Sequence, residues 1–316
     1  MNMYTPAEKP TLYFIGVTTG KSAIMKIFPE WARLLELGDC AIRGIDFVPH
    51  DDPCRYRQAV SFIKSDPLSF GALVTTHKID LFRASRDLFD EVDKYAALMG
   101  EASCISKRNG NLRAHAKDPI TAGLALESFL PPKHWENTRA EALIFGAGGS
   151  SLAITWYLMK PERGKNRPSR IIVANRSHGR LAEMRHLHER LGFGIPVEYH
   201  HVQSPIEADR LLEGLRPGSL VINATGLGKD SPGSPVSDAA VFPQEGYVWD
   251  FNYRGDLLFV QQARAQERLR RLRVEDGWIY FIHGWTQVIA EVFDVEIPVS
   301  GPMFDKLSEV AAKLRN

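Results

Sequence analysis

The sequence has few cysteines, no long apolar run and almost no net charge. Its three cysteines, Cys40, Cys54 and Cys104, are an odd number without CxxC spacing, which argues against a disulfide framework or a zinc knuckle and suits a reducing cytoplasm. No run approaches the roughly 18 apolar residues of a membrane span, and the N-terminus lacks a cationic start followed by an apolar core. We therefore expect a cytoplasmic protein that is neither exported nor inserted into a membrane.

The charge balance also limits the partners. A net charge of +1 gives no general attraction for nucleic acid or anionic lipid, and the arginine-rich stretch "RAQERLRRLR" is best explained as a solvated helix. His186 and His188 cannot share a helical face, and His200 and His201 would point to opposite faces of a strand, so we predict no metal site. A small molecule is the expected ligand.

The hydrophobic patterning predicts an α/β fold with two domains. The 316 residues suffice for two domains of ordinary size. Short β-rich runs ("TLYFIGVTT", "AIRGIDFV", "GALVTT") alternate with helical patterns in the first third, which predicts βαβ units around a largely parallel sheet. The Asn-Gly of "SCISKRNGNLRAHA" predicts a hairpin, and "KDPITAGLALESFL" predicts a helix.

A second series of strands follows the proline-rich stretch "LPPKHWENTRAE". We predict a substrate domain formed by residues 1–118 and 277–316, and a Rossmann-type dinucleotide-binding domain, residues 119–276, inserted between its two parts. The active site is expected between the two domains.

The motif "LIFGAGGSS" carries the strongest functional signal. Gly146, Gly148 and Gly149 lie after an apolar strand and before a helix, where glycine permits a tight turn and the helix N-terminus attracts phosphate. Ser151 replaces the third glycine of the usual fingerprint, and its small size still allows helix and strand to pack. A glycine cluster in an ordinary loop is the alternative.

The end of the next strand bears on cofactor choice. An NAD-selective site would place an acidic residue there, whereas this chain has Asn175 and Arg176, followed by Ser177 and Arg180. Guanidinium and hydroxyl groups suit a 2′-phosphate, so we predict NADP. A pair of solvated arginines is the alternative.

Four further residues are candidates for the site. Asn223 and Thr225 end a later strand in "VINATGLG", where ligands of an open parallel sheet lie, although a simple turn would use the same residues. Lys78 follows the run "GALVTT", and reduction of a ketone needs such a proton donor. Asp118 could orient that lysine, but a solvated lysine and an N-cap aspartate are the alternatives.

Together these segments resemble the shikimate dehydrogenase family, which catalyses NADP-dependent reduction of 3-dehydroshikimate and includes quinate and shikimate oxidoreductases. The segments "GAGGSS", "ANRS", "NATGLG" and "DFNY" resemble its dinucleotide-binding elements in their order. "ALVTTHK" resembles the catalytic-lysine segment and "GNLRAHAKD" the segment that ends in the catalytic aspartate, which implies that Lys78 and Asp118 are catalytic. The implied cofactor-binding residues are Gly146, Ala147, Gly148, Gly149, Ser150, Ser151, Asn175, Arg176, Ser177, Arg180, Asn223, Ala224, Thr225 and Gly226.

The resemblance is weaker at the positions that would hold the substrate. The residues that differ from the family's are Val74 for a threonine, Ser103 for an asparagine, Ala116 and Lys117 for an asparagine and a threonine, Pro119 for a glycine, Ile24 for the second serine of a pair, and His283 or Gly284 for a glutamine. Thr75 or Thr76 taking the place of the threonine is the alternative for Val74. The substrate-binding residues implied by position or by proximity are Ser22, Thr75, Ser103, Tyr253, His283 and Gln287.

The sequence therefore predicts an NADP-dependent oxidoreductase, monomeric or homodimeric. Its expected substrate is 3-dehydroshikimate/shikimate or a related cyclic hydroxy acid. A non-catalytic relative that senses a metabolite or nucleotide is the alternative, because altered binding residues would also suit a sensor.

Overall fold

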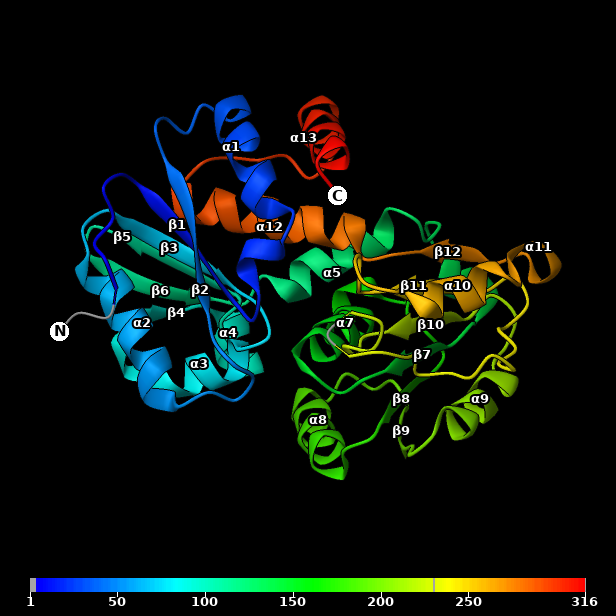
Figure 1. Cartoon of the computed structure of the whole chain (residues 1–316). Helices are drawn as coiled ribbons and strands as arrows, with labels where there is room; N and C mark the ends of the chain where they lie inside the picture. The colour runs from blue at the N-terminus through cyan, green and yellow to red at the C-terminus, as the bar shows by residue number, and fades with distance from the viewer. Residues whose placement is uncertain (1–3, 230, 316) are drawn as a thin grey trace. The chain divides into compact units, whose positions relative to one another are not determined.

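The computed structural model describes residues 4–229 and 231–315 and confirms the predicted α/β class. The chain divides into two compact units, Met1–Asp118 with Ile282–Asn316, and Pro119–Phe281. The first boundary follows Asp118, the first residue of a helix. The second boundary precedes Ile282, inside another helix and five residues after residue 277, where we expected the chain to return to the first domain. Figure 1 shows the two units, which are described separately below.

The strands are β1 (Thr11–Gly16), β2 (Ala41–Asp46), β3 (Ser69–Val74), β4 (Glu91–Val92), β5 (Cys104–Arg108), β6 (Asn111–His115), β7 (Ala142–Phe145), β8 (Ile171–Asn175), β9 (Val197–His201), β10 (Leu220–Asn223), β11 (Tyr247–Asp250) and β12 (Arg273–Glu275). The α-helices are α1 (Ile24–Leu34), α2 (Pro53–Ser65), α3 (Lys78–Ser85), α4 (Lys94–Met99), α5 (Asp118–Glu127), α6 (His134–Thr138), α7 (Gly149–Met159), α8 (His178–Leu191), α9 (Pro205–Glu213), α10 (Leu258–Arg264), α11 (Glu267–Arg270), α12 (Trp278–Phe293) and α13 (Pro302–Lys313). Short 3₁₀ turns are η1 (Thr19–Lys21), η2 (Arg86–Leu88) and η3 (Pro161–Arg163).

The sheet of the first unit is mixed, with strand order β2-β1-β3-β5-β6-β4. Strands β2, β1 and β3 run parallel, as the alternating pattern predicts, but β5 is antiparallel to both β3 and β6. The predicted hairpin joins β5 to β6 through Asn109 and Gly110, which both have positive φ (52° and 80°). This backbone geometry matches the tight turns that favour Asn-Gly.

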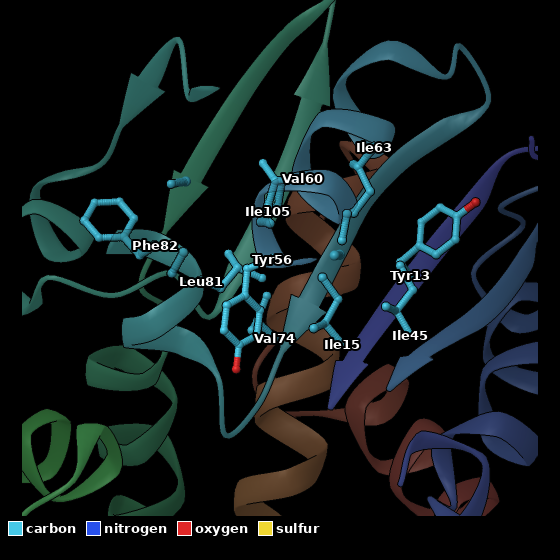
Figure 2. Packing of buried hydrophobic residues seen from close by; sticks show 14 of the residues in the cluster. Tyr13, Ile15, Ile45, Tyr56, Val60, Ile63, Val74, Leu81, Phe82 and Ile105 are labelled. Atoms are coloured by element: carbon cyan, nitrogen blue, oxygen red, sulfur yellow. The ribbon is translucent and has the colours of Figure 1, made fainter. Parts of the chain in front are cut away.

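The two faces of this sheet are covered by different helices. On one face, Tyr13 and Ile15 of β1 share a buried cluster with α2 and α3 (Figure 2). On the other face, Phe14 packs edge-on against Trp285 of α12, with ring centroids 5.0 Å apart. The alternation along β1 therefore places neighbouring residues in two separate layers of core, and the C-terminal helices complete the unit.

The sheet of the second unit is entirely parallel, with order β12-β11-β10-β7-β8-β9. This is the doubly wound arrangement, whose strand order reverses between β7 and β10. Residues from four of the strands share a buried cluster with α9 and α10 on one face, and Trp249 packs against Phe129 on the other. Ligands of such a sheet bind beyond the carboxyl ends of the strands at the reversal point.

No helix in the described part of the chain combines the length and hydrophobicity that a membrane crossing requires.

Candidate active site

The glycine-rich turn lies at the carboxyl end of β7, at the reversal point of the second sheet. Gly146 has φ 112°, and a Cβ atom there would lie 2.7 Å from the carbonyl oxygen of Ala224 in the loop after β10. Only glycine fits, because the backbone conformation is strained for other residues and the two loops approach too closely for a side chain. Gly148 precedes α7, and no group of the residues that the structure describes lies within 4 Å of where its Cβ would be. The turn and the start of α7 therefore leave room for a phosphate group at the helix N-terminus.

A buried polar network shapes the loop after β10. Asn223 is fully buried, donates to Asp250 at 3.1 Å and accepts from the backbone and hydroxyl groups of Thr225 at 3.1 and 2.6 Å. Asn252 donates to the carbonyl oxygens of Thr225 and Leu227. Burial raises the pKa of the Asp250 carboxyl to about 7, while hydrogen bonds from the two asparagines oppose this increase. Asn223 thus holds the loop in place, and Thr225 is one of the loop residues that line the neighbouring cavity.

A cavity of about 750 Å³ opens beside both loops. Eight predicted cofactor residues line it: Gly146, Ala147, Gly148, Asn175, Arg176, Ala224, Thr225 and Gly226. The other six lie outside the lining: Gly149, Ser150 and Ser151 belong to the first turn of α7, Ser177 and Arg180 to the start of α8, and Asn223 to the buried network. The cavity fits a dinucleotide, since its size and its glycine-lined edge suit an extended ligand with a pyrophosphate.

Sequence reasoning missed part of this lining. Gln203, Ser204, the segment 232–238, Leu258 and Gln262 also line the cavity. These residues come from loops and a helix that the sheet topology brings to the end of β8 and β10. No local motif identifies them.

The two predicted phosphate-binding arginines differ. Arg176 is exposed, lines the cavity, and among the described residues its guanidinium has no hydrogen bond or salt bridge. Arg180 does not line the cavity and forms a salt bridge with Glu183 at 2.9 Å. The Ser177 hydroxyl accepts from the backbone N–H of Arg180 and caps α8. Arg176 is therefore the cation that is available to an anion in the cavity.

The first unit brings Lys78 and Asp118 together. Lys78 is the first residue of α3 and Asp118 the first of α5, and the Lys78 Nζ donates a short hydrogen bond to Oδ2 of Asp118. Both side chains are largely buried, with 14% and 13% exposure. Burial alone would lower the pKa of Lys78, but the negative charges of Asp118 and Glu101 outweigh this effect and raise it. The pair is thus a buried ammonium and carboxylate, forty residues apart in sequence.

The backbone around this pair is fixed by its neighbours. Thr76 precedes α3 with φ 35°, and the Lys78 carbonyl oxygen accepts from the N–H of Ala102 at 3.2 Å. The Ser103 hydroxyl accepts from the N–H of Lys117 at 2.8 Å, and the N–H of Val74 donates to the carbonyl of Ser103. Strand β3, the start of β5 and the end of β6 therefore meet beside Lys78.

The six predicted substrate-binding residues lie in different settings. Ser103 is buried within this junction, whereas Thr75 is half-buried and donates its hydroxyl to the carbonyl of Ile15 at 3.3 Å. Ser22 is buried directly after η1. On α12, His283 is buried and its ring stacks on Phe304, and Gln287 is half-buried one turn further along. Tyr253 belongs to the second unit, where its ring lies against those of Trp278 and Phe281. Burial lowers the pKa of His283 to about 4, so its ring is neutral at physiological pH.

The Lys117 ammonium forms an ion pair with a neighbouring carboxylate and is not free to bind a ligand. Its Nζ donates to Glu291 of α12 at 2.6 Å, and Arg108 forms a salt bridge with Asp294 at 2.8 Å. His115 lies 3.5 Å from Glu291. The family's threonine position is thus occupied by a lysine whose charge is already balanced by a carboxylate.

Sequence reasoning missed Glu101. This residue follows α4, is 1% exposed, and its charge interacts with both Lys78 and Asp118. The signal in the sequence was a single acidic residue in the otherwise uncharged stretch "GEASC", and burial could not be read from it. Among the described residues no cluster of three or more His, Cys, Asp or Glu side chains could hold a metal ion.

Comparison of the sequence and the fold with those of known proteins identifies the family of the chain. No family model matches the chain. The shikimate dehydrogenase (NADP(+)) of Rhodopseudomonas palustris is 32% identical over 282 residues, which cover 88% of this chain and 88% of that enzyme. The chain belongs to the shikimate dehydrogenase family. This match is longer than either compact unit, so it spans both.

Two further shikimate dehydrogenases show one shorter sequence match and one longer structural match. The enzyme of Streptococcus thermophilus is 26% identical over 183 residues, which cover 56% of this chain and 58% of that protein. The crystal structure of shikimate 5-dehydrogenase from Thermus thermophilus in complex with NADP(H) and shikimate has a TM-score of 0.69 at 20% identity, covering 96% of this chain and 99% of that one. The second similarity shows that the shikimate dehydrogenase fold is kept across almost the whole chain.

Proposed function

We propose that this member of the shikimate dehydrogenase family is an NADP-dependent oxidoreductase. It would transfer hydride reversibly between the cofactor and the keto or hydroxyl carbon of a shikimate-like cyclic hydroxy acid. The observation that carries the proposal is the buried Lys78–Asp118 ion pair, because an ammonium held at the edge of a sheet by one carboxylate is a positioned proton donor. NADP and shikimate are the ligands of the Thermus enzyme of the same fold.

The second unit would bind the cofactor. The backbone of Gly146 and Gly148 and the start of α7 would hold the pyrophosphate, because the two glycines carry no side chain and the helix N-terminus attracts phosphate. Arg176 would meet the 2′-phosphate, and Thr225 would contact the ligand from the loop that Asn223 and Asp250 fix. When bound, NADPH supplies the hydride.

The first unit would handle the proton. As a ketone is reduced, negative charge develops on its oxygen, and Lys78 can donate a proton from Nζ to that oxygen. Asp118 keeps the ammonium charged and oriented before the transfer, since it accepts a hydrogen bond from the same nitrogen. In the oxidation direction the neutral amine would take the hydroxyl proton. Because the Lys78–Asp118 pair is largely buried, water competes little with the substrate for the proton of Lys78.

The substrate would differ from shikimate in its hydroxyl or carboxyl pattern. Val74 and Ala116 are buried and offer no polar side-chain atoms, and Ser103, whose hydroxyl accepts from the backbone N–H of Lys117, has one hydroxyl where the family has an amide. Lys117 is paired with Glu291 and would have to leave that carboxylate to bind another. These features favour a less hydroxylated cyclic acid or alcohol.

Steady-state turnover tests the proposal. The protein should oxidise or reduce at least one member of a panel containing shikimate, quinate, 3-dehydroshikimate and simpler cyclic hydroxy acids, followed by NADPH absorbance. Lys78→Ala should lower that turnover by about a hundredfold or more. Binding of panel members, seen as an increase in melting temperature, without any turnover would instead support a metabolite sensor.

A further inference from the structure

A third ionisable side chain lies beside the Lys78–Asp118 pair. Glu101 follows Gly100, whose φ of 65° ends α4, and precedes β5. The next backbone N–H, that of Ala102, donates to the Lys78 carbonyl oxygen, which ties this connection to the start of α3. Among the described residues, the charges that act on Glu101 are those of Lys78 on α3 and Asp118 on α5.

The burial of the Glu101 carboxyl is not explained by any hydrogen bond from the described residues. Both carboxyl oxygens are buried, and neither accepts a hydrogen bond from a described residue. Asp118, in contrast, accepts directly from the Lys78 ammonium. A buried carboxylate without hydrogen bonds is unfavourable, and an apolar side chain of similar length would fill the space without that penalty. Packing alone therefore does not account for a carboxyl group at this position.

We propose that Glu101 is a positioning residue that acts through Lys78, and that its protonation state sets how readily the Lys78 ammonium releases its proton. The inference rests on the proposed function, because it assigns a role within that proton transfer. It adds a third group, from the α4–β5 connection, to the lysine and aspartate.

The direction of the effect follows from the charges. Burial raises the pKa of the Glu101 carboxyl to about 7; the Lys78 ammonium opposes this increase and the Asp118 carboxylate adds to it. Below about pH 7 Glu101 is protonated, and only the Asp118 carboxylate acts on the Lys78 ammonium. Above that pH both the Asp118 and the Glu101 carboxylates act on it. The second negative charge holds the Lys78 proton more tightly. Reduction of a ketone should therefore slow as the pH rises through neutrality.

The pH dependence of kcat for reduction tests this role. At saturating NADPH and ketone, the unmodified protein should lose about three- to tenfold of its kcat across neutrality, as expected for a weaker acid. Glu101→Gln keeps the shape but cannot ionise, so its profile should lack that decline. Glu141→Gln is the matched control, because Glu141 is also buried but lies in the second unit, paired with Arg170; it should keep the decline. An unchanged decline in Glu101→Gln would overturn the proposal.

A second measurement does not depend on turnover or on the folding of Glu101→Gln. In protein labelled with ¹³C at the glutamate side-chain carboxyls, one resonance should titrate near pH 7. Lys78→Met should move that titration to higher pH, because the neighbouring positive charge is gone. The proposal is wrong if every glutamate titrates in the ordinary acidic range, or if Lys78→Met leaves the high titration unchanged. If no ketone is reduced, the proposed function fails, while this titration still decides whether Glu101 is coupled to Lys78.

Discussion

Replacement of Arg176 by Ala should remove most of the preference for NADP over NAD. Arg176 follows β8, lines the cavity of the second unit and is exposed. Its guanidinium has no salt bridge or hydrogen bond among the described residues, so a 2′-phosphate would not have to displace an existing partner. NAD lacks that phosphate and should not depend on this side chain.

The magnitude follows from the type of contact and its exposure. A charge-assisted hydrogen bond contributes about 1.5 to 3 kcal/mol, and solvent around an exposed arginine favours the lower end of that range. About 1.5 kcal/mol corresponds to roughly a tenfold change in Kd. We therefore expect Arg176→Ala to weaken NADP binding about tenfold and to change NAD binding little. Arg176→Lys should fall between, since it keeps the charge but loses the planar fork.

Arg180→Ala is the matched control. Arg180 lies four residues further along, is already paired with Glu183, and does not line the cavity. Calorimetric titration of the three variants and the unmodified protein with NADP and NAD, at fixed ionic strength, gives the eight affinities needed. The reasoning would be refuted by equal affinities of the unmodified protein for both cofactors, or by a larger loss in Arg180→Ala than in Arg176→Ala.

Three further outcomes are expected. Lys78→Ala and Asp118→Ala should each lower kcat by about a hundredfold or more, while the affinity for NADP stays near normal. Asp118→Asn should fold but remain impaired, because Asn caps a helix without supplying the negative charge; full activity of this variant in steady-state assays would contradict the role of Asp118 in proton transfer. Shikimate should be a poor substrate, because each of its hydroxyls left unpaired by the apolar side chains of Val74 and Ala116 costs about 1 to 3 kcal/mol. A kcat/KM near 10⁵ M⁻¹s⁻¹, roughly typical of an enzyme on its own substrate, would show that this argument about the pocket is wrong. Burial raises the pKa of Asp250 to about 7 in the folded state, so the folded protein keeps a proton that the unfolded chain releases near pH 4. Between about pH 4 and pH 7 the free energy of unfolding should therefore fall by up to about 1.4 kcal/mol per pH unit as the pH rises. Urea unfolding at pH 5 and pH 8 should show a smaller fall in Asp250→Asn, and an equal fall would count against this assignment.

Local sequence patterns were enough to establish the fold class and several of its turns. The Asn109-Gly110 pair forms the tight hairpin because both residues tolerate positive φ. Gly146 occupies a turn that only glycine fits, between a β-strand and a helix that the apolar pattern already indicates. These features depend on the conformational preferences of a few adjacent residues, which a single sequence carries directly.

Long-range packing decided the rest. The sequence treats Arg176 and Arg180 alike, but the start of α8 leaves the first at the cavity and the second beside Glu183. It likewise predicts that Asn223 binds the cofactor, but it does not reveal that Asn223 donates a buried hydrogen bond to Asp250 of the neighbouring strand β11. Glu101 shows the same limit, because the burial that raises its pKa and the charges beside it come from elements distant in sequence. The sequence by itself therefore determined which local structures form, and only the tertiary structure decided which side chains meet, since burial and charge proximity depend on elements far apart in the chain.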